Sequence, residues 1–356
     1  MIRWRSGRVS AVGREWPGVR EVTVDVPSDG ATPALAYVDL VGSPDIGDEV
    51  VLNTTALAQG LGTGGHALVV ALPGRLPADQ DGPGHIVKAR YTPLQTSVLG
   101  VDEQQSDHHD LIAAATSLDG LPVVVSDLHS ALPAVVAGLL AERPDARIAY
   151  VLTDGGALPL AYSRTVAALS EQLCGTVSTG QAFGGDLETV TVHTGLLAAR
   201  HVLRADVAVV SQGPGNLGTG TPWGFSGVAA GEAVNAVGVL GGRAVGALRI
   251  SGADARERHR GISHHCLTAF GRVALAPVDL VVPAPLPETV AVTVERQLAG
   301  LGGPGRVVRV PDTGLRDVLR RSPVSMSTMG RSLETDLIYF VAAAAAGRYA
   351  ARLIGG

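Results

Sequence analysis

The sequence has few residues of several kinds, and each shortage excludes a class of protein. Only two cysteines, Cys174 and Cys266, occur in 356 residues, so the fold does not rest on disulfides and no cysteine-based zinc motif exists. Lysine occurs once, at Lys88, which excludes a Walker A phosphate loop and leaves one position for Schiff-base chemistry. The longest apolar run, from Leu337 to Ala346, is far shorter than the ~20 residues of a membrane span.

The overall charge and the beginning of the chain narrow the class of protein further. A net charge of −5 spread over the chain is not typical of a general nucleic-acid-binding protein. The first sixteen residues, MIRWRSGRVSAVGREW, have no apolar centre, so they do not form a signal peptide. We therefore expect a cytoplasmic protein that binds neither nucleic acid nor membrane.

The first 95 residues have the pattern of a small β-rich domain. Short apolar segments alternate with turns rich in Gly, Pro and Asp, which predicts a barrel or sandwich. The expected strands are 8–12, 21–26, 34–40, 49–52 and 67–71. Two glycine-rich stretches, 60–65 and 81–84, are turns or part of a binding surface.

From residue 121 onward, strands alternate with helices. This alternation predicts a mainly parallel, doubly wound sheet with helices on both faces, in a Rossmann-like α/β domain spanning 121–356. The range 96–120 is expected to be a linker. The expected strands are 122–125, 147–152, 175–178, 189–193, 206–210, 244–250, 278–282 and 306–310. The expected helices are 131–141, 158–173, 195–203, 225–239, 287–298 and 332–354; the last packs on the domain or across a homodimer.

Polar residues follow six of these predicted strands. They are Ser126–Ser130, Thr153–Gly156, Ser178–Gln181, His193–Gly195, the loop Ser211–Gly224 and the stretch from Arg249 to His265. One such residue is often a helix cap. Because parallel strands end at one edge of a sheet, where ligands of α/β proteins bind, six together predict a binding site there.

The Ser211–Gly224 loop contains five glycines in fourteen residues. Such a loop can turn its backbone N–H groups toward an anion such as a phosphate or carboxylate. The expected ligand-binding residues are Gly213, Gly215, Asn216, Gly218 and Thr219. The glycine spacing also fits a dinucleotide motif, but Pro222 delays the helix and Arg249 stands where an acidic residue is expected. The sequence thus leaves the cofactor unknown, and an ordered loop without a ligand is the alternative.

A segment rich in arginine and histidine follows. Arg249, Ser251, Arg256 and Arg260 are expected to bind an anion, because guanidinium groups match its geometry. His259 and His264 are candidate acid–base or metal-binding residues. Because two adjacent helical residues point in different directions, we expect only one of His264 and His265 to be functional. The alternative is a set of buried ion pairs that organise the loop.

Three further residues complete the candidate site. Asp127 and His129 lie two positions apart, which suits chelation of a divalent metal or a pair of an acid and the residue that orients it. The alternative is that Asp127 caps a helix and His129 lies beside it by chance. Asp154 binds Mg²⁺ or a ligand hydroxyl, or it caps a helix. The run from Asp107 to Asp110 has metal-binding residue types, but its polar surroundings favour a solvated loop. We treat both cysteines as core residues.

Several strings resemble one known family along nearly the whole chain. They are TDGGALPLAYS (153–163), TGQAFGGDLE (179–188), the loop 211–227 and ISGADARERHRGISHHCLTAFGR (250–272), with HALVVA (66–71) and RYTPLQ (90–95). The sequence resembles a bacterial family named domain of unknown function 3866. The resemblance implies no activity.

These observations predict a function only in outline. The leading hypothesis is an enzyme that binds a small anionic metabolite at the carboxyl ends of the strands, although the sequence does not establish that the protein is an enzyme. One alternative is a non-catalytic ligand sensor or assembly scaffold. Another is a metal-dependent hydrolase that uses Asp127, His129 and His264.

Overall fold

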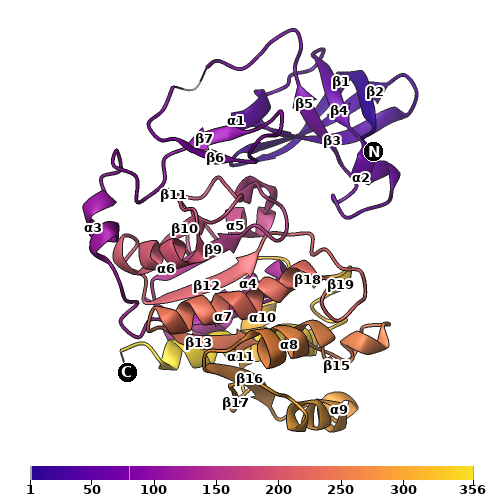
Figure 1. The fold of residues 1–356 in the computed structure, drawn as a ribbon. Helices are drawn as coiled ribbons and strands as arrows, with labels where there is room; N and C mark the ends of the chain where they lie inside the picture. The colour runs from indigo at the N-terminus through magenta and orange to yellow at the C-terminus, as the bar shows by residue number, and fades with distance from the viewer. Residues whose placement is uncertain (1, 80, 356) are drawn as a thin grey trace. The chain divides into compact units, whose positions relative to one another are not determined.

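The computed structural model describes residues 2–79 and 81–355, and it separates the chain into two compact units. Unit 1 contains residues 1–98 together with 161–167, and unit 2 contains residues 99–160 and 168–356. Figure 1 shows the elements of each unit. None of the described helices has the length and hydropathy that crossing a bilayer requires.

Unit 1 is a closed five-stranded barrel in the order β1-β2-β3-β5-β4. Its strands alternate buried and exposed side chains, and twelve buried apolar residues fill its interior. The strands are β1 (Trp4–Trp16), β2 (Val19–Val26), β3 (Gly30–Tyr37), β4 (Glu49–Asn53) and β5 (Ala67–Ala71), with the short helices α1 (Val38–Val41) and α2 (Thr55–Ala58) and the hairpin β6 (Ile86–Lys88) and β7 (Thr96–Val98). The predicted β-rich, barrel-like N-terminal domain is confirmed.

A short segment from later in the chain completes unit 1. The indole N–H of Trp16 donates a hydrogen bond to the Ala161 carbonyl at 2.6 Å, and the Arg164 guanidinium lies 5.8 Å from the Trp16 ring. The predicted long helix 158–173 is therefore wrong. The short 3-10 helix η2 (Leu160–Tyr162) and α5 (Arg164–Ala168) replace it, because this segment packs as part of the barrel unit.

Unit 2 contains an eight-stranded sheet in the order β11-β10-β9-β12-β8-β13-β16-β17, in which every pairing is parallel. The strands are β8 (Pro122–Val125), β9 (Ile148–Thr153), β10 (Gly175–Ser178), β11 (Leu187–Glu188), β12 (Val207–Gln212), β13 (Arg243–Ala247), β16 (Val278–Ala284) and β17 (Gly305–Pro311). The central strands are continuous apolar runs that are buried on both faces, as parallel strands between helices must be. The predicted α/β fold is confirmed.

Two sets of helices cover the two faces of the sheet (Figure 1). One set is α4 (Leu132–Glu142), α10 (Leu315–Arg320) and α11 (Leu337–Arg352), and the other is α3 (His109–Ala114), α6 (Val192–His201), α7 (Ala229–Val239) and α8 (His264–Thr268). Helix α9 (Glu288–Ala299) packs on the small sheet of β14 (Ile250–Ser251) and β15 (Gly261–Ile262), and β18 (Ser327–Thr328) pairs with β19 (Arg331–Ser332). The alanines of α11 pack on α4 within unit 2.

Two sequence predictions for unit 2 differ from the structure in detail. The predicted strand 189–193 is wrong: Thr191 caps α6 by accepting the N–H of Thr194 at 3.2 Å, so His193 lies in a helix. Unit 2 also begins at Leu99, inside the range 96–120 that was expected to be a linker. Val101 and Ile112 of that range are buried in the main core.

The strand order creates a switch point between β8 and β12. The chain leaves β8 through α4 toward β9, and it leaves β12 through α7 toward β13, so the two connections run in opposite directions on opposite faces. Ligands of open α/β sheets bind at such points, beyond the carboxyl ends of the strands. Five of the six predicted polar strand ends follow adjacent strands of this sheet, namely β10, β9, β12, β8 and β13.

Candidate functional site

The residues that follow β8 and β12 meet at the switch point. The Gln212 amide nitrogen donates hydrogen bonds to the Asp127 carbonyl and to the Asn216 Oδ1, both at 2.7 Å. A small cavity of about 10 Å³ lies here, lined by Ser126, Asp127, Ser211, Gln212 and Gly227 among others. Asp127 Oδ2 and Gln212 Oε1 are buried and have no hydrogen-bond partner among the described residues.

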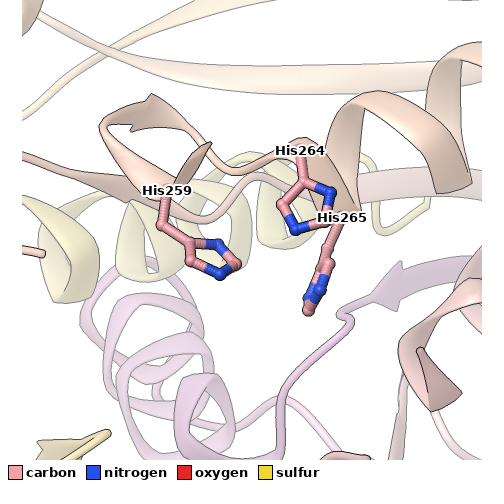
Figure 2. A group of neighbouring side chains, drawn as sticks. All are labelled: His259, His264 and His265. Carbon is pink, nitrogen blue, oxygen red and sulfur yellow. The ribbon is translucent and has the colours of Figure 1, made fainter. Parts of the chain in front are cut away.

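Three histidines lie together (Figure 2), and one of them, His265, lies beside Asp127. His259 ends the 3-10 helix η4 (Glu257–His259), and His264 and His265 begin α8, which Ser263 caps. One nitrogen of each ring lies within 4.8 Å of one nitrogen of each other ring. The small sheet of β14 and β15 closes the intervening loop on itself, and this closure brings His259 back to the start of α8.

His264 and His265 both turn toward His259, although adjacent helical residues were expected to point in different directions. Their ring centroids are 4.4 Å apart, and both rings contact His259. Two adjacent residues in the first turn of a helix point about 100° apart, but both rings lie at the helix end, where each can turn toward a common point. Which of the two histidines is functional stays a prediction, and the position of the His265 ring adds it to the candidate residues.

Each histidine has a distinct set of contacts. The Nδ1 atom of His259 lies 2.7 Å from the Ser263 hydroxyl, and the Nδ1 atom of His265 lies 3.7 Å from Asp127 Oδ2. The Phe225 ring stacks on His265 with centroids 3.9 Å apart and an interplanar angle of 3°. The His264 Nε2 atom is buried without a hydrogen-bond partner in the described structure.

His259 and His264 are electrically neutral near pH 7. Burial lowers the pKa of His259 to about 3, and the positive charges of Arg249 and Arg256 lower it further. Burial and the neighbouring His265 lower the pKa of His264 to about 4. A neutral imidazole keeps a lone pair for a proton or a metal ion.

Asp254 forms ion pairs with Arg249 and Arg256, two of the arginines that the sequence suggested as anion ligands. It is 1% exposed. Its carboxylate accepts one hydrogen bond from Arg249 at 3.0 Å and two from Arg256, from Nε and Nη2, each at 2.9 Å. Arg331, which the sequence analysis did not mark, lies 3.2 Å away and also binds Asp336 at 2.9 Å. Burial raises the pKa of Asp254, but the hydrogen bonds and charges of these arginines outweigh it and hold that pKa well below its ordinary value.

Ser251 belongs to the same cluster, because its hydroxyl donates to the Asp336 carboxylate at 2.7 Å. Arg260 lies outside the ion pairs: its Nε donates to the backbone carbonyl of Asp254 at 3.2 Å. Arg258 lies against Gly220 of the glycine-rich loop. Neither Arg258 nor Arg260 has a carboxylate within ion-pair distance among residues 2–79 and 81–355, so their charges face solvent.

The glycine-rich loop lies beside the histidines but uses several of its polar groups internally. The Thr219 N–H donates to the Gly224 carbonyl at 2.8 Å, and Asn216 accepts from Gln212 and Ser226. Gly213 packs directly against the Ala157 backbone, and Gly218 bridges to Phe225. Gly215, with φ of 91°, has open space around its Cα. Hydrogen bonds and packing within the loop thus give it a fixed shape.

The remaining candidates lie apart from the three histidines. The Nδ1 atom of His129 contacts the Tyr150 hydroxyl at 3.0 Å, and Tyr150 in turn contacts Ser211. Burial lowers the pKa of His129 to about 4. Asp154 is exposed, and its carboxylate accepts the Gln181 N–H at 2.9 Å. Asp127 faces His265, and the Asp154 carboxylate fixes a neighbouring turn.

The comparisons with known proteins identify a family. A family model described as "Protein of unknown function (DUF3866)" matches residues 33–347. The chain belongs to this family. The matched range begins in β3 of the barrel and ends in α11, so it contains every residue of the candidate site. No curated protein matches the chain. The family description assigns no reaction or ligand, so the function must be argued from the site.

Proposed function

We propose that the protein is an enzyme that binds a small anionic molecule at the switch point of unit 2. The observation that carries this proposal is that Arg258 and Arg260 have no carboxylate partner in the described structure, while Arg258 lies close enough to His264 to lower the pKa of that ring. Arginine forks bind phosphate and carboxylate groups well. Neutral imidazoles can take up a proton from a bound ligand.

The charges in the cluster support an anion as the ligand. Arg249, Arg256 and Arg331 face two carboxylates, those of Asp254 and Asp336. One positive charge remains after pairing, and Arg258 and Arg260 add to it. Glu257, the remaining acidic residue of the segment 249–260, offsets one of these charges, so the group keeps a positive excess although the whole chain carries a net charge of −5. Such a field raises the local concentration of anionic ligands.

The residues take different roles in this proposal from those that the sequence suggested. Arg258 and Arg260 bind the anion, whereas Arg249, Arg256 and Ser251 shape the loop through Asp254 and Asp336. The glycine-rich loop, including Gly215 and Thr219, forms one wall. In the absence of a bound metal ion, His259 and His264 are the groups that can accept a proton.

A ligand screen tests the proposal. Thermal unfolding of the full chain is measured with inorganic phosphate and with a panel of phosphorylated and carboxylated metabolites. Each hydrogen bond to a charged group contributes about 1.5–3 kcal/mol, so Arg258→Gln and Arg260→Gln should each weaken the best ligand by roughly ten-fold or more. The control is Arg316→Gln, on α10 at the opposite face of the sheet. The proposal fails if no anion stabilises the protein, or if the three variants bind alike.

A non-catalytic sensor is the second candidate, and the Asp254 cluster favours it. The ion pairs of Arg249 and Arg256 give the loop a fixed shape without any ligand, as a binding protein requires. The two candidates differ in turnover. Incubating the best anion with wild-type protein and with His264→Gln, followed by mass analysis of the ligand, identifies an enzyme if only the wild type converts it.

A further inference from the structure

The three histidines fit a divalent transition metal better than they fit a buried polar core. We propose that His259, His264 and His265 hold a zinc-type cation, with Asp127 supporting His265 from behind. This inference goes beyond the proposed function, because it rests on the geometry of the three rings and does not require an anionic ligand.

Buried polar atoms without a hydrogen-bond partner among the described residues lie together here. They include Asp127 Oδ2, Gln212 Oε1, His264 Nε2 and His265 Nδ1. Folded proteins leave few such atoms, because each costs about 1–3 kcal/mol. A metal ion satisfies His264 Nε2 directly, because a neutral imidazole nitrogen carries a lone pair.

The ring nitrogens that remain for a metal follow from the contacts of the other nitrogens. The His259 Nδ1 atom lies 2.7 Å from the Ser263 hydroxyl, which leaves its Nε2 for a metal. The buried nitrogen of His264 without a partner is also Nε2. The His265 Nδ1 atom faces Asp127 Oδ2 at 3.7 Å, a distance at which the two atoms form no hydrogen bond. Metal-binding histidines characteristically hold the second ring nitrogen on a carboxylate or another oxygen, as Ser263 does for His259.

Distance and ligand type also suit a transition metal. Zn–N bonds of about 2.0–2.1 Å in a tetrahedron place ligand nitrogens roughly 3.3 Å apart. One nitrogen of each ring lies within 4.8 Å of one nitrogen of each other ring, so the rings need to turn only a little to bind one ion. Three imidazoles without thiolate or carboxylate ligands suit Zn²⁺, Co²⁺, Ni²⁺ or Cu²⁺ rather than Mg²⁺ or Ca²⁺.

Three protein ligands leave the fourth tetrahedral position open, as in catalytic rather than structural zinc sites. His264 is only partly buried, whereas His259 and His265 are buried, so this ring lies closest to solvent. Phe225 stacks on His265 and covers its face. The open position would therefore take water or one atom of a ligand.

The test uses metal binding, without any assay of activity. The full chain is stripped with a chelator and titrated with Zn²⁺ against a chromophoric chelator, and with Co²⁺ followed by visible spectroscopy. We expect one Zn²⁺ per chain and the absorption bands of tetrahedral Co²⁺. Mg²⁺ should not compete. The absence of stoichiometric Zn²⁺ and of the Co²⁺ bands in the wild-type protein overturns the proposal without the use of any variant.

Variants then locate the site. His264→Gln, at the partly buried ring, should weaken Zn²⁺ binding by roughly a hundred-fold or more, and Asp127→Asn by roughly 10–100-fold. The matched control is His193→Gln, an exposed histidine on α6. Circular dichroism verifies that each variant is folded. Arg258→Gln and Arg260→Gln should retain full Zn²⁺ affinity, so failure of the anion proposal and failure of the metal proposal give different results. Equal affinity of His264→Gln and wild type contradicts the metal proposal.

Discussion

Replacing Asp254 by asparagine removes the carboxylate on which three arginines converge. Asp254 and Arg249 are 1% and 2% exposed, and their charged atoms are 3.0 Å apart. Asparagine keeps the size of the side chain but leaves the Arg249 charge buried and unpaired. Breaking a buried ion pair on one side costs about 3–5 kcal/mol. We therefore expect Asp254→Asn to lower the free energy of unfolding of unit 2 by about that amount.

The assay is urea-induced unfolding, followed by a probe within unit 2 so that the barrel does not obscure the transition. Arg256→Gln is the matched control, because its side chain is 36% exposed and water replaces its contact at a cost of about 1 kcal/mol or less. Asp254→Asn should lower the free energy of unfolding clearly more than Arg256→Gln does. If both variants change the free energy of unfolding by the same small amount, the buried ion pair of Asp254 and Arg249 does not stabilise unit 2 as we infer.

Two further predictions concern stability. The folded pKa of His129 is about 4 against an ordinary value of 6.5, so between these pH values only the unfolded chain binds the proton and stability falls as the pH falls. Titrated unfolding should show the stability advantage of wild type over His129→Asn narrowing by about 3 kcal/mol between pH 6.5 and 4, and a constant difference contradicts the prediction. A Cβ at Gly347 would overlap the Val135 carbonyl where α11 meets α4, so Gly347→Ala should cost about 1–3 kcal/mol. Gly300→Ala, where the nearest atom is 3.7 Å away, should be close to neutral in the same denaturation experiment.

The parallel sheet of unit 2 is predictable because each of its strands has a local sequence pattern that indicates a buried strand. Pro122–Val125 is a four-residue apolar run that is fully buried as β8, and its neighbours in the sheet have the same character. The polar residues after these runs must lie at one edge once the strands are parallel. The location of the site therefore follows from short-range patterns. The segment 189–193 was predicted as a strand because Thr189 and Thr191 have high β propensity. In the structure Thr191 instead caps a helix.

The roles of individual site residues were not predictable, because they depend on contacts between distant segments. Arg331 and Asp336 reach the loop near Asp254 from about eighty residues further along the chain. Nothing in the local sequence indicates that Asp254 would take up Arg249 and Arg256. A basic stretch has the same sequence pattern whether its arginines bind a ligand or form ion pairs with carboxylates of the protein.

His265 shows a different limit. Helical periodicity separates adjacent side chains, and this reasoning holds inside a helix but not at its first turn. The start of α8 at His264 is fixed by the Ser263 cap, which the sequence contains. The return of His259 to the same point depends on the pairing of β14 with β15, two strands that are each two residues long and carry no detectable pattern.

The most direct test of the site is crystallographic. Crystals of the full chain soaked with Zn²⁺ and phosphate are measured on either side of the zinc absorption edge. The account predicts a single anomalous peak between the rings of His259, His264 and His265, with phosphate density within reach of Arg258 or Arg260. A zinc peak at another place, or histidines that remain without metal while phosphate binds elsewhere, would contradict it.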